Sequence, residues 1–254
     1  MQNFRCVRLV PLFLVSSFAL ANGSRPPRVD MPAHRSPDAT AAVFYPDDKF
    51  TIKTVADLEK AVVKLPGSLM TQNSSGIWVW DLGGGILDGT NQSGDEGQSE
   101  TQEQIARIKM PLIIRNGFIR HNKNALQFYA VDSGVEKITW LTVGEDAVAT
   151  HDGAERFSVV DCEFLNNRDG DKSIQLNEAK DAIIRNNLIY SGITCIRVGD
   201  DHTTEISDNV EITHNRFVGC DTDVNASKIT VLMRDNTLEG VRKERIISNG
   251  AIYR

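Results

Sequence analysis

The chain has 254 residues, of which 41% are hydrophobic, and a formal net charge of −6 at pH 7. This length is sufficient for one sizeable hydrophobic core, and an acidic chain without basic clusters is a poor candidate for binding nucleic acid. If its ligand is itself a polyanion, positive charge must be supplied locally, and a metal ion is one source of it.

The first element in chain order is a secretory signal over residues 1–21. Arg5 and Arg8 precede the apolar run LVPLFLVSSFALA, which ends in small residues at Ala19 and Ala21. A basic, an apolar and a small-residue segment in this order are typical of a cleaved leader, and the run is too short for a membrane anchor. We therefore expect a secreted protein, extracellular or periplasmic, with no membrane attachment after cleavage.

An extended segment and a helix follow the signal. Residues 22–45 are rich in proline and polar residues and show no period, which predicts a linker. The segment TVADLEKAVVKLPG then has apolar residues at helical spacing, a capping residue at Thr54 and a stop at Pro66. It predicts an amphipathic helix at about 54–65, the first element of one β domain over residues 46–254.

Short similar segments recur after the helix at intervals of 21–28 residues. Each begins with an apolar or soft residue and ends with an apolar one, and most have asparagine at the fourth position. Repetition at this period is the signature of a solenoid. The segments are IIRNGF (113–118), ITWLTV (138–143), VVDCEF (159–164), IRNNLI (184–189), ITHNRF (212–217) and MRDNTL (233–238).

The composition of these repeats indicates which solenoid to expect. Regularly placed leucines are absent, and short β-branched and aromatic segments alternate with Asn, Asp and Gly turns. Asparagine tolerates the left-handed conformation, so one per coil can form a hydrogen-bonded ladder at a repeated bend. We therefore expect an all-β, right-handed parallel β-helix whose first coil is capped by the N-terminal amphipathic helix. An antiparallel two-sheet sandwich is the alternative, and it fits the single-unit spacing less well.

Oxygen-bearing side chains recur at about one coil's spacing in the middle of the repeats. Residues one coil apart in a β-helix lie about 4.8 Å apart. Glu145 and Asp146 end one predicted strand, Asn124 lies one coil earlier, and Asp171 one coil later. Carboxylates with an amide and no histidine are the ligands that Ca²⁺ prefers. Each turn taken alone is compatible with a solvated loop, but the common spacing predicts a calcium site.

Two cationic side chains accompany this cluster. Lys172 follows Asp171 directly, and Arg197 follows Lys172 by 25 residues, about one repeat. We therefore expect both cations on the same outer face as the acids.

The segments VGEDAVATHDG (143–153), GDKSIQLN (170–177) and CIRVG (195–199) together resemble the core of pectate lyases of polysaccharide lyase family three. The resemblance spans about residues 112–200, and its motifs are specific in combination and weak singly. The helical segment and several repeats also resemble family-one pectate lyases, although the arginine segment of that family has no counterpart here.

The resemblance implies a secreted enzyme that cleaves 1,4-linked polygalacturonate (pectate) by Ca²⁺-dependent β-elimination. Glu145 and Asp146 match the family's calcium-binding pair, Lys172 its conserved-segment lysine, and Arg197 its catalytic arginine. An arginine base predicts an alkaline optimum, because arginine is otherwise protonated at all accessible pH values. The implied partner is an acidic polysaccharide, and we expect a monomer.

Two positions depart from the family pattern and keep other functions open. Asn124 stands where the family has an acid, and Thr194 where it has a lysine. A non-catalytic polysaccharide-binding protein or adhesin is therefore one alternative. A polygalacturonase-type hydrolase is another, since GEDAVA loosely resembles its acidic segment, but the downstream motifs of that class are missing.

Three cysteines remain after the leader: Cys162, Cys195 and Cys220. An odd number argues against a disulfide framework. We expect small buried core residues, with the oxidation of one pair left open.

Overall fold

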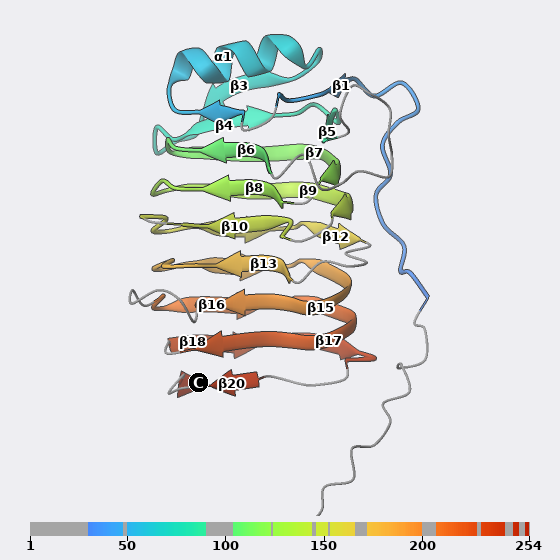
Figure 1. The fold of residues 1–254 in the computed structure, drawn as a ribbon, viewed down its shortest axis with the longest axis vertical. Coiled ribbons are helices and arrows are strands. Elements are labelled where there is room, and N and C mark those ends of the chain that lie inside the picture. Colours follow the sequence, from blue (N-terminus) through green and yellow to red (C-terminus); the bar gives the residue numbers. More distant parts are fainter. Residues whose placement is uncertain are drawn as a thin grey trace, which may run out of the picture.

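The computed structural model describes residues 30–47, 50–89, 104–122, 124–143, 146–151, 153–165, 172–199, 207–227, 230–241, 246–248 and 252–253. These residues form strands that stack in coils along one axis, with a single helix at the N-terminal end (Figure 1). The predicted fold class, a parallel β-helix with an N-terminal cap, is confirmed. In this part of the chain no helix has the length and apolar character needed to cross a membrane.

Helix α1 (Val55–Lys64) covers the first coil (Figure 1). Thr54 and Asp57 form a capping box in which each side chain accepts from the other residue's backbone N–H, so the helix begins where the sequence predicts. Leu58 and Leu65 are fully buried against the solenoid. The predicted amphipathic helix is thus confirmed, and it shields the apolar end of the stack from water.

Three ladders of parallel strands form the walls of the solenoid, and we call them sheets A, B and C. In sheet A the partners are joined directly from one coil to the next. Its rungs are β2 (Thr51–Ile52), β6 (Gln104–Ile108), β8 (Asn124–Phe128), β10 (Val148–Thr150), β13 (Lys172–Leu176), the second halves of β15 (Leu188–Val198) and β17 (Arg216–Ser227), and β20 (Ile246–Ser248).

Sheet B is built in the same way and carries one antiparallel strand at its N-terminal end, β3 (Leu69–Gln72), next to β4. Its parallel rungs are β4 (Trp78–Asp81), the first halves of β7 (Leu112–Asn122) and β9 (Gly134–Val143), β11 (Ser158–Val160), β14 (Ile183–Arg185), β16 (Val210–Thr213), β18 (Thr230–Arg234) and β21 (Ile252–Tyr253).

Sheet C completes each coil, and the longest strands turn a corner so that they belong to two sheets. Its rungs are β1 (Val43–Phe44), β5 (Ile86–Asp88), the second halves of β7 and β9, β12 (Glu163–Leu165), the first halves of β15 and β17, and β19 (Thr237–Glu239).

The interior consists of stacked like side chains. Leu126, Val148, Ile174 and Ile196 are direct partners on successive rungs of sheet A, and all four are fully buried. Aromatic rings stack in the same manner, as between Trp140 and Phe164, whose centroids are 4.4 Å apart. Because each rung buries the same kind of side chain, the apolar core is one continuous column.

An asparagine ladder holds the corner between sheets B and C. Asn187, Asn215 and Asn236 lie on successive rungs. Each side-chain oxygen accepts from a backbone N–H one rung earlier, and each Nδ2 donates to a carbonyl there, as from Asn215 to Ile184 O at 3.0 Å. The predicted ladder is present in these coils.

Two details of the predicted ladder are wrong. The left-handed residue at this corner is the one before each ladder asparagine, for example Asn186 with φ of 58°. Thr139 lies opposite Glu163 and Ile138 opposite Gly117, so the segments 138–143 and 113–118 lie three residues and one residue, respectively, out of the predicted register. An apolar side chain can occupy this bend, and asparagine alone therefore does not mark it.

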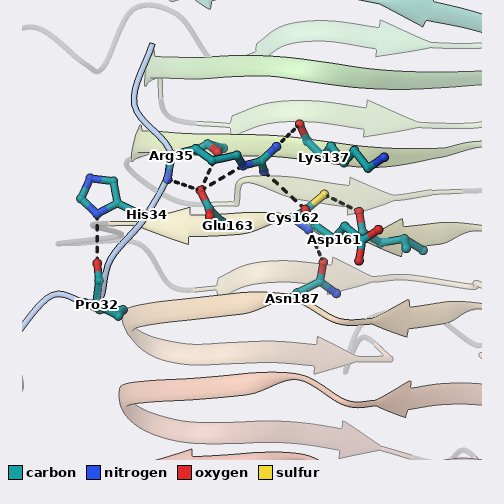
Figure 2. Close-up of polar contacts among 10 residues, drawn as sticks. Pro32, His34, Arg35, Lys137, Asp161, Cys162, Glu163 and Asn187 are labelled. Atoms are coloured by element: carbon teal, nitrogen blue, oxygen red, sulfur yellow. Dashed lines mark hydrogen bonds and ion pairs between the residues drawn. The ribbon is translucent and has the colours of Figure 1, made fainter. Parts of the chain in front are cut away.

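The N-terminal segment 30–42 runs along the outside of the solenoid, past several coils, before it joins β1 (Figure 1). Arg35 fastens it, as Figure 2 shows: its backbone N donates to Glu163 Oε2 at 2.9 Å, and its guanidinium donates to the carbonyls of Lys137 at 2.8 Å and Asp161 at 3.3 Å. Both carbonyls belong to left-handed bend residues on successive rungs. The predicted linker is thus extended over its described part, and it docks on the solenoid.

The three cysteines form one disulfide and leave one thiol free. Cys195 and Cys220 form a disulfide between β15 and β17, which is the oxidation of one pair that the sequence leaves open. Cys162 is free and buried, as expected. Parallel stacking brings side chains 25 residues apart together, which cysteine spacing alone does not reveal.

Candidate functional site on the outer face of sheet A

A polar column marks the corner where the chain enters sheet A. The corner column consists of Asn124, Asp146, Lys172 and Thr194. Lys172 and Thr194 are direct strand partners, and Ala125 N donates to Asp146 O at 2.9 Å. Asp146 N donates to the Asn124 side-chain oxygen at 3.4 Å. Four residues spread over 70 positions of the sequence therefore lie on four consecutive rungs, as the repeat predicts.

The corner column faces outward. The residues that follow its members, among them Ala125, Ala147 and Cys195, are buried in the core. Because neighbouring side chains in extended backbone point to opposite sides, the corner column points to the surface. The second residue after each member of the corner column is also buried. The chain therefore bends at this corner, and regular alternation of side chains begins after it, within sheet A.

Lys172 and Asp146 form an ion pair in the corner column. Lys172 Nζ lies 3.9 Å from Asp146 Oδ1, and the two side chains are 15% and 17% exposed. This separation is at the long limit for an ion pair. Partial burial makes the pair more sensitive to the loss of either member than an exposed pair is.

A second column runs along the middle of the outer face. The central column consists of Arg107, Gln127, Ala149, Gln175 and Arg197, which are direct partners on five consecutive rungs. The residue before each of them is buried in the core. This column therefore points outward, with an arginine at each end and amides between.

A third column borders the central one on the side toward sheet B. The rings of Tyr129 and His151 stack with centroids 4.8 Å apart and planes inclined by 14°. Lys109 Nζ lies 5.0 Å from the centroid of the Tyr129 ring, and Tyr129 Oη donates to Gln127 Oε1 at 2.9 Å. The ring faces are thus used within the protein, so these rings stiffen the outer face and do not form an open platform for a sugar.

Gln175 has an unsatisfied acceptor in the central column. Its Nε2 donates to Asn177 Oδ1 at 2.5 Å and lies 3.4 Å from Gly199 O. Its Oε1 is buried and has no hydrogen-bond partner among the described residues. An unsatisfied buried acceptor costs about 1–3 kcal/mol.

The structure brings some of the predicted calcium ligands together. Asp146 and Asn124 are adjacent, whereas Glu145 and Asp171 lie outside the described residues. No group of three His, Cys, Asp or Glu side chains suited to a metal occurs in the described part of the chain. A carboxylate and an amide oxygen on neighbouring rungs are suitable donors for Ca²⁺, which takes 6–8 oxygen ligands. The two described residues fit such an ion as part of a larger set.

The two predicted catalytic residues share this face. Arg197 is the partner of Gln175, and Lys172 begins the same strand, β13. Lys172 and Arg197 are thus one rung and three residues apart, or roughly 11 Å between Cα atoms. Two long cationic side chains at this separation can reach one sugar unit between them.

Sequence reasoning missed most of the central column. Arg107 and Gln127 precede the recognised motifs, and Gln175 lies in the segment 170–177 with no role assigned to it. The available signal was the register itself, because positions 107, 127, 149, 175 and 197 recur at 20–26 residues. Extending the repeat outward from Arg197 would have found them.

Comparisons with known proteins add no assignment. No protein-family model matches the sequence, and no curated protein matches it significantly.

Proposed function

We propose that this chain is a secreted, pectate lyase-like protein that binds 1,4-linked polygalacturonate on the outer face of sheet A and cleaves it by Ca²⁺-dependent β-elimination. One observation carries the proposal. In an acidic chain, Lys172 and Arg197 stand on adjacent rungs of one outer face, next to Asp146 and a row of amides. A polyuronate requires this combination of local positive charge and hydroxyl-binding groups.

Lys172 would bind the uronate carboxylate. β-Elimination removes the proton on C5, next to this carboxylate, and expels the glycosidic oxygen on C4. Negative charge develops on the carboxylate as the proton leaves, so a positioned ammonium stabilises the transition state more than the ground state.

Arg197 would accept the C5 proton. Arginine is protonated under ordinary conditions, so this role requires surroundings that disfavour its charge. The protein should therefore be most active at alkaline pH, where the neutral guanidine is more populated.

Asp146, Asn124 and Glu145 would hold the calcium ion. When bound, calcium supplies a Lewis acid that neutralises the substrate carboxylate. The paired Asp146 carboxylate is the described residue best suited to it.

Binding without turnover is the second candidate. Thr194, 9% exposed, is the neutral partner of Lys172, where the resemblance places a lysine. The site consequently has one cation fewer to disfavour the charge on Arg197. A binding protein would retain the outer face and lack the elimination step.

The ultraviolet absorbance of the 4,5-unsaturated product separates these functions. We expect product from polygalacturonate at alkaline pH with Ca²⁺, and none after chelation. Arg197→Lys should reduce turnover by at least about 100-fold while the protein still binds the polymer, and Arg185→Lys on the outer face of sheet B should change neither. If no product forms at any pH from neutral to strongly alkaline, the lyase proposal is wrong. Retained binding would then identify a binding protein.

A further inference from the structure

A hairpin at the N-terminal end of the solenoid presents an asparagine followed by two serines. Strands β3 and β4 pair antiparallel next to α1 (Figure 1), and residues 73–77 join them. The sequence there is Asn73-Ser74-Ser75, an N-x-S sequon of the kind that accepts N-linked oligosaccharides. Ser74 and Ser75 are exposed, and Asn73 is partly exposed. The proposed function does not involve this hairpin, which belongs to sheet B.

The turn holds the Asn73 side chain in one orientation. Its Oδ1 accepts from Ser75 N at 3.0 Å and from Ile77 N at 3.0 Å. Gly76 N donates to Asn73 O at 3.0 Å, and Gly76 has a φ of 77°, which glycine adopts without strain. The amide oxygen is therefore fixed, whereas Asn73 Nδ2 and Ser75 Oγ have no hydrogen bond to any residue that the structure describes.

This orientation suits the transfer of a glycan to Asn73 Nδ2. When this nitrogen forms a new bond and loses a proton, negative charge develops on Oδ1, and the two backbone N–H groups are placed to stabilise that charge. The hydroxyl of Ser75, two residues further on, is the other group that the sequon requires. The hairpin tip thus combines an unbonded amide nitrogen, a stabilised amide oxygen and the serine at the required position.

The other described sequon lacks this geometry. Residues 225–227 (Asn-Ala-Ser) lie within β17, and their backbone pairs with β15 on one side and with β20 on the other. Extended backbone carries the N–H two residues on away from the asparagine side chain, so the hydrogen bond of the turn does not form there. Two more sequons, at Asn22 and Asn91, lie outside the described residues. Within the described part of the chain, only the sequon at Asn73 lies in a turn.

We propose that Asn73 is an acceptor site for an N-linked oligosaccharide. The donor is a lipid-linked oligosaccharide diphosphate, used by the oligosaccharide transferase of a secretory pathway. Asn73 Nδ2 attacks C1 of the first sugar, the bond between C1 and the diphosphate oxygen breaks, and the lipid diphosphate leaves. One proton passes from Nδ2 to a base of the transferase, and the product is an N-glycosylated amide.

A glycan at this position is compatible with the fold and with the proposed function. Asn73 Nδ2 donates to no described residue, so its substitution breaks no hydrogen bond among them. The hairpin lies at one end of sheet B, whereas the corner and central columns lie on sheet A. Polygalacturonate binding should therefore be the same with and without the glycan, and the two proposals can fail independently.

The test is site-resolved mass spectrometry of the chain secreted by insect cells behind a standard leader, before and after a peptide N-glycosidase that converts the linked asparagine to aspartate. We expect glycan on Asn73 in most molecules. Occupancy at Asn225 should be at least about tenfold lower, the rate factor that one hydrogen bond to a developing charge supplies. Ser75→Ala should abolish the modification of Asn73 and keep the turn, because Ser75 contributes its backbone N–H to it.

Ser74→Ala is the matched control, because Ser74 is exposed and occupies the variable position of the sequon. This variant should be glycosylated like the wild type. Unmodified Asn73 in the secreted wild type overturns the site, and so does a modification that persists in Ser75→Ala. Equal occupancy at Asn73 and Asn225 overturns the role of the turn. An equal loss in both serine variants overturns the role of the Ser75 hydroxyl.

Discussion

The corner between sheets B and C and the outer face of sheet A are built by the same stacking rule but handle polar groups differently. At the corner, every ladder asparagine donates to and accepts from the neighbouring rung, and Arg35 caps two bend carbonyls. On the outer face of sheet A, the Lys172–Asp146 contact is long and Gln175 Oε1 has no described donor.

The difference separates structural from functional polarity. A network of buried hydrogen bonds in which every donor and acceptor is paired stabilises the fold and leaves no donor or acceptor for a ligand. A face on which an ion pair is long and a buried acceptor is unsatisfied contributes less to stability. Substitutions at the corner should therefore lower stability, and substitutions on the outer face of sheet A should lower binding.

Asn215→Ala should have the largest effect on stability. The side chain is fully buried and bonds to both neighbouring rungs, so its removal leaves several buried partners unsatisfied. We expect the free energy of unfolding to fall by about 3 kcal/mol, measured by denaturant titration. Polymer binding below the melting temperature should be unchanged. A loss of unfolding free energy below about 1 kcal/mol would show that the hydrogen bonds of the asparagine ladder do not stabilise this corner.

Cys162 should make the same corner sensitive to alkali. Burial raises the pKa of its thiol to about 12, compared with about 8.5 in an unfolded chain. Between these values the unfolded chain binds fewer protons than the folded one, so stability falls by about 1.4 kcal/mol per pH unit as pH rises.

Cys162→Ala should flatten this dependence, as followed by melting temperature against pH. The control is wild type at neutral pH, where the thiol is protonated in both states and contributes no slope. An unchanged slope in the variant would contradict the assignment to Cys162.

Arg35→Gln should detach the N-terminal segment from the solenoid. The Glu163 side chain, which is 18% exposed, has two described side-chain partners, Arg35 and Thr139. Without the Arg35 guanidinium it keeps only Thr139. We expect a loss of about 1–2 kcal/mol and faster proteolysis before residue 43. His34→Gln, next in the chain and bonded only locally, is the matched control. Equal protease sensitivity of both variants would argue against the clamp.

Lys172→Met should have the smallest effect on stability and a large one on binding. The 3.9 Å contact with Asp146 is long and methionine keeps the apolar stem of the side chain, so we expect a stability loss of about 1 kcal/mol although both groups are partly buried. Polygalacturonate binding should nevertheless fall by at least about tenfold, as measured by retardation in a gel containing the polymer. Lys180→Met, at an exposed turn beside Glu155, should bind normally. Wild-type affinity in the Lys172 variant would remove this residue from the site.

The repeat allowed much of this fold to be predicted, because a solenoid converts sequence spacing into spatial proximity. The helix, the coil period and the adjacency of Asn124, Asp146 and Lys172 followed from it. The docking of Arg35 and the Cys195–Cys220 disulfide did not. Both depend on which rung a segment reaches and on side-chain direction, and neither leaves a periodic signal.

The site was predicted in part for the same reason. Motif resemblance marked the end of the central column at Arg197 but not the end at Arg107. Arg107 lies outside the motifs, and only the strand register of sheet A connects it with Arg197.

A crystal structure of the Arg197→Lys protein with Ca²⁺ and a heptagalacturonate tests the central claim most directly. We predict an oligomer along the axis of sheet A, with a uronate carboxylate bound at Lys172. A ligand bound on sheet B or C, or one that crosses sheet A without contacting Lys172, would contradict the account.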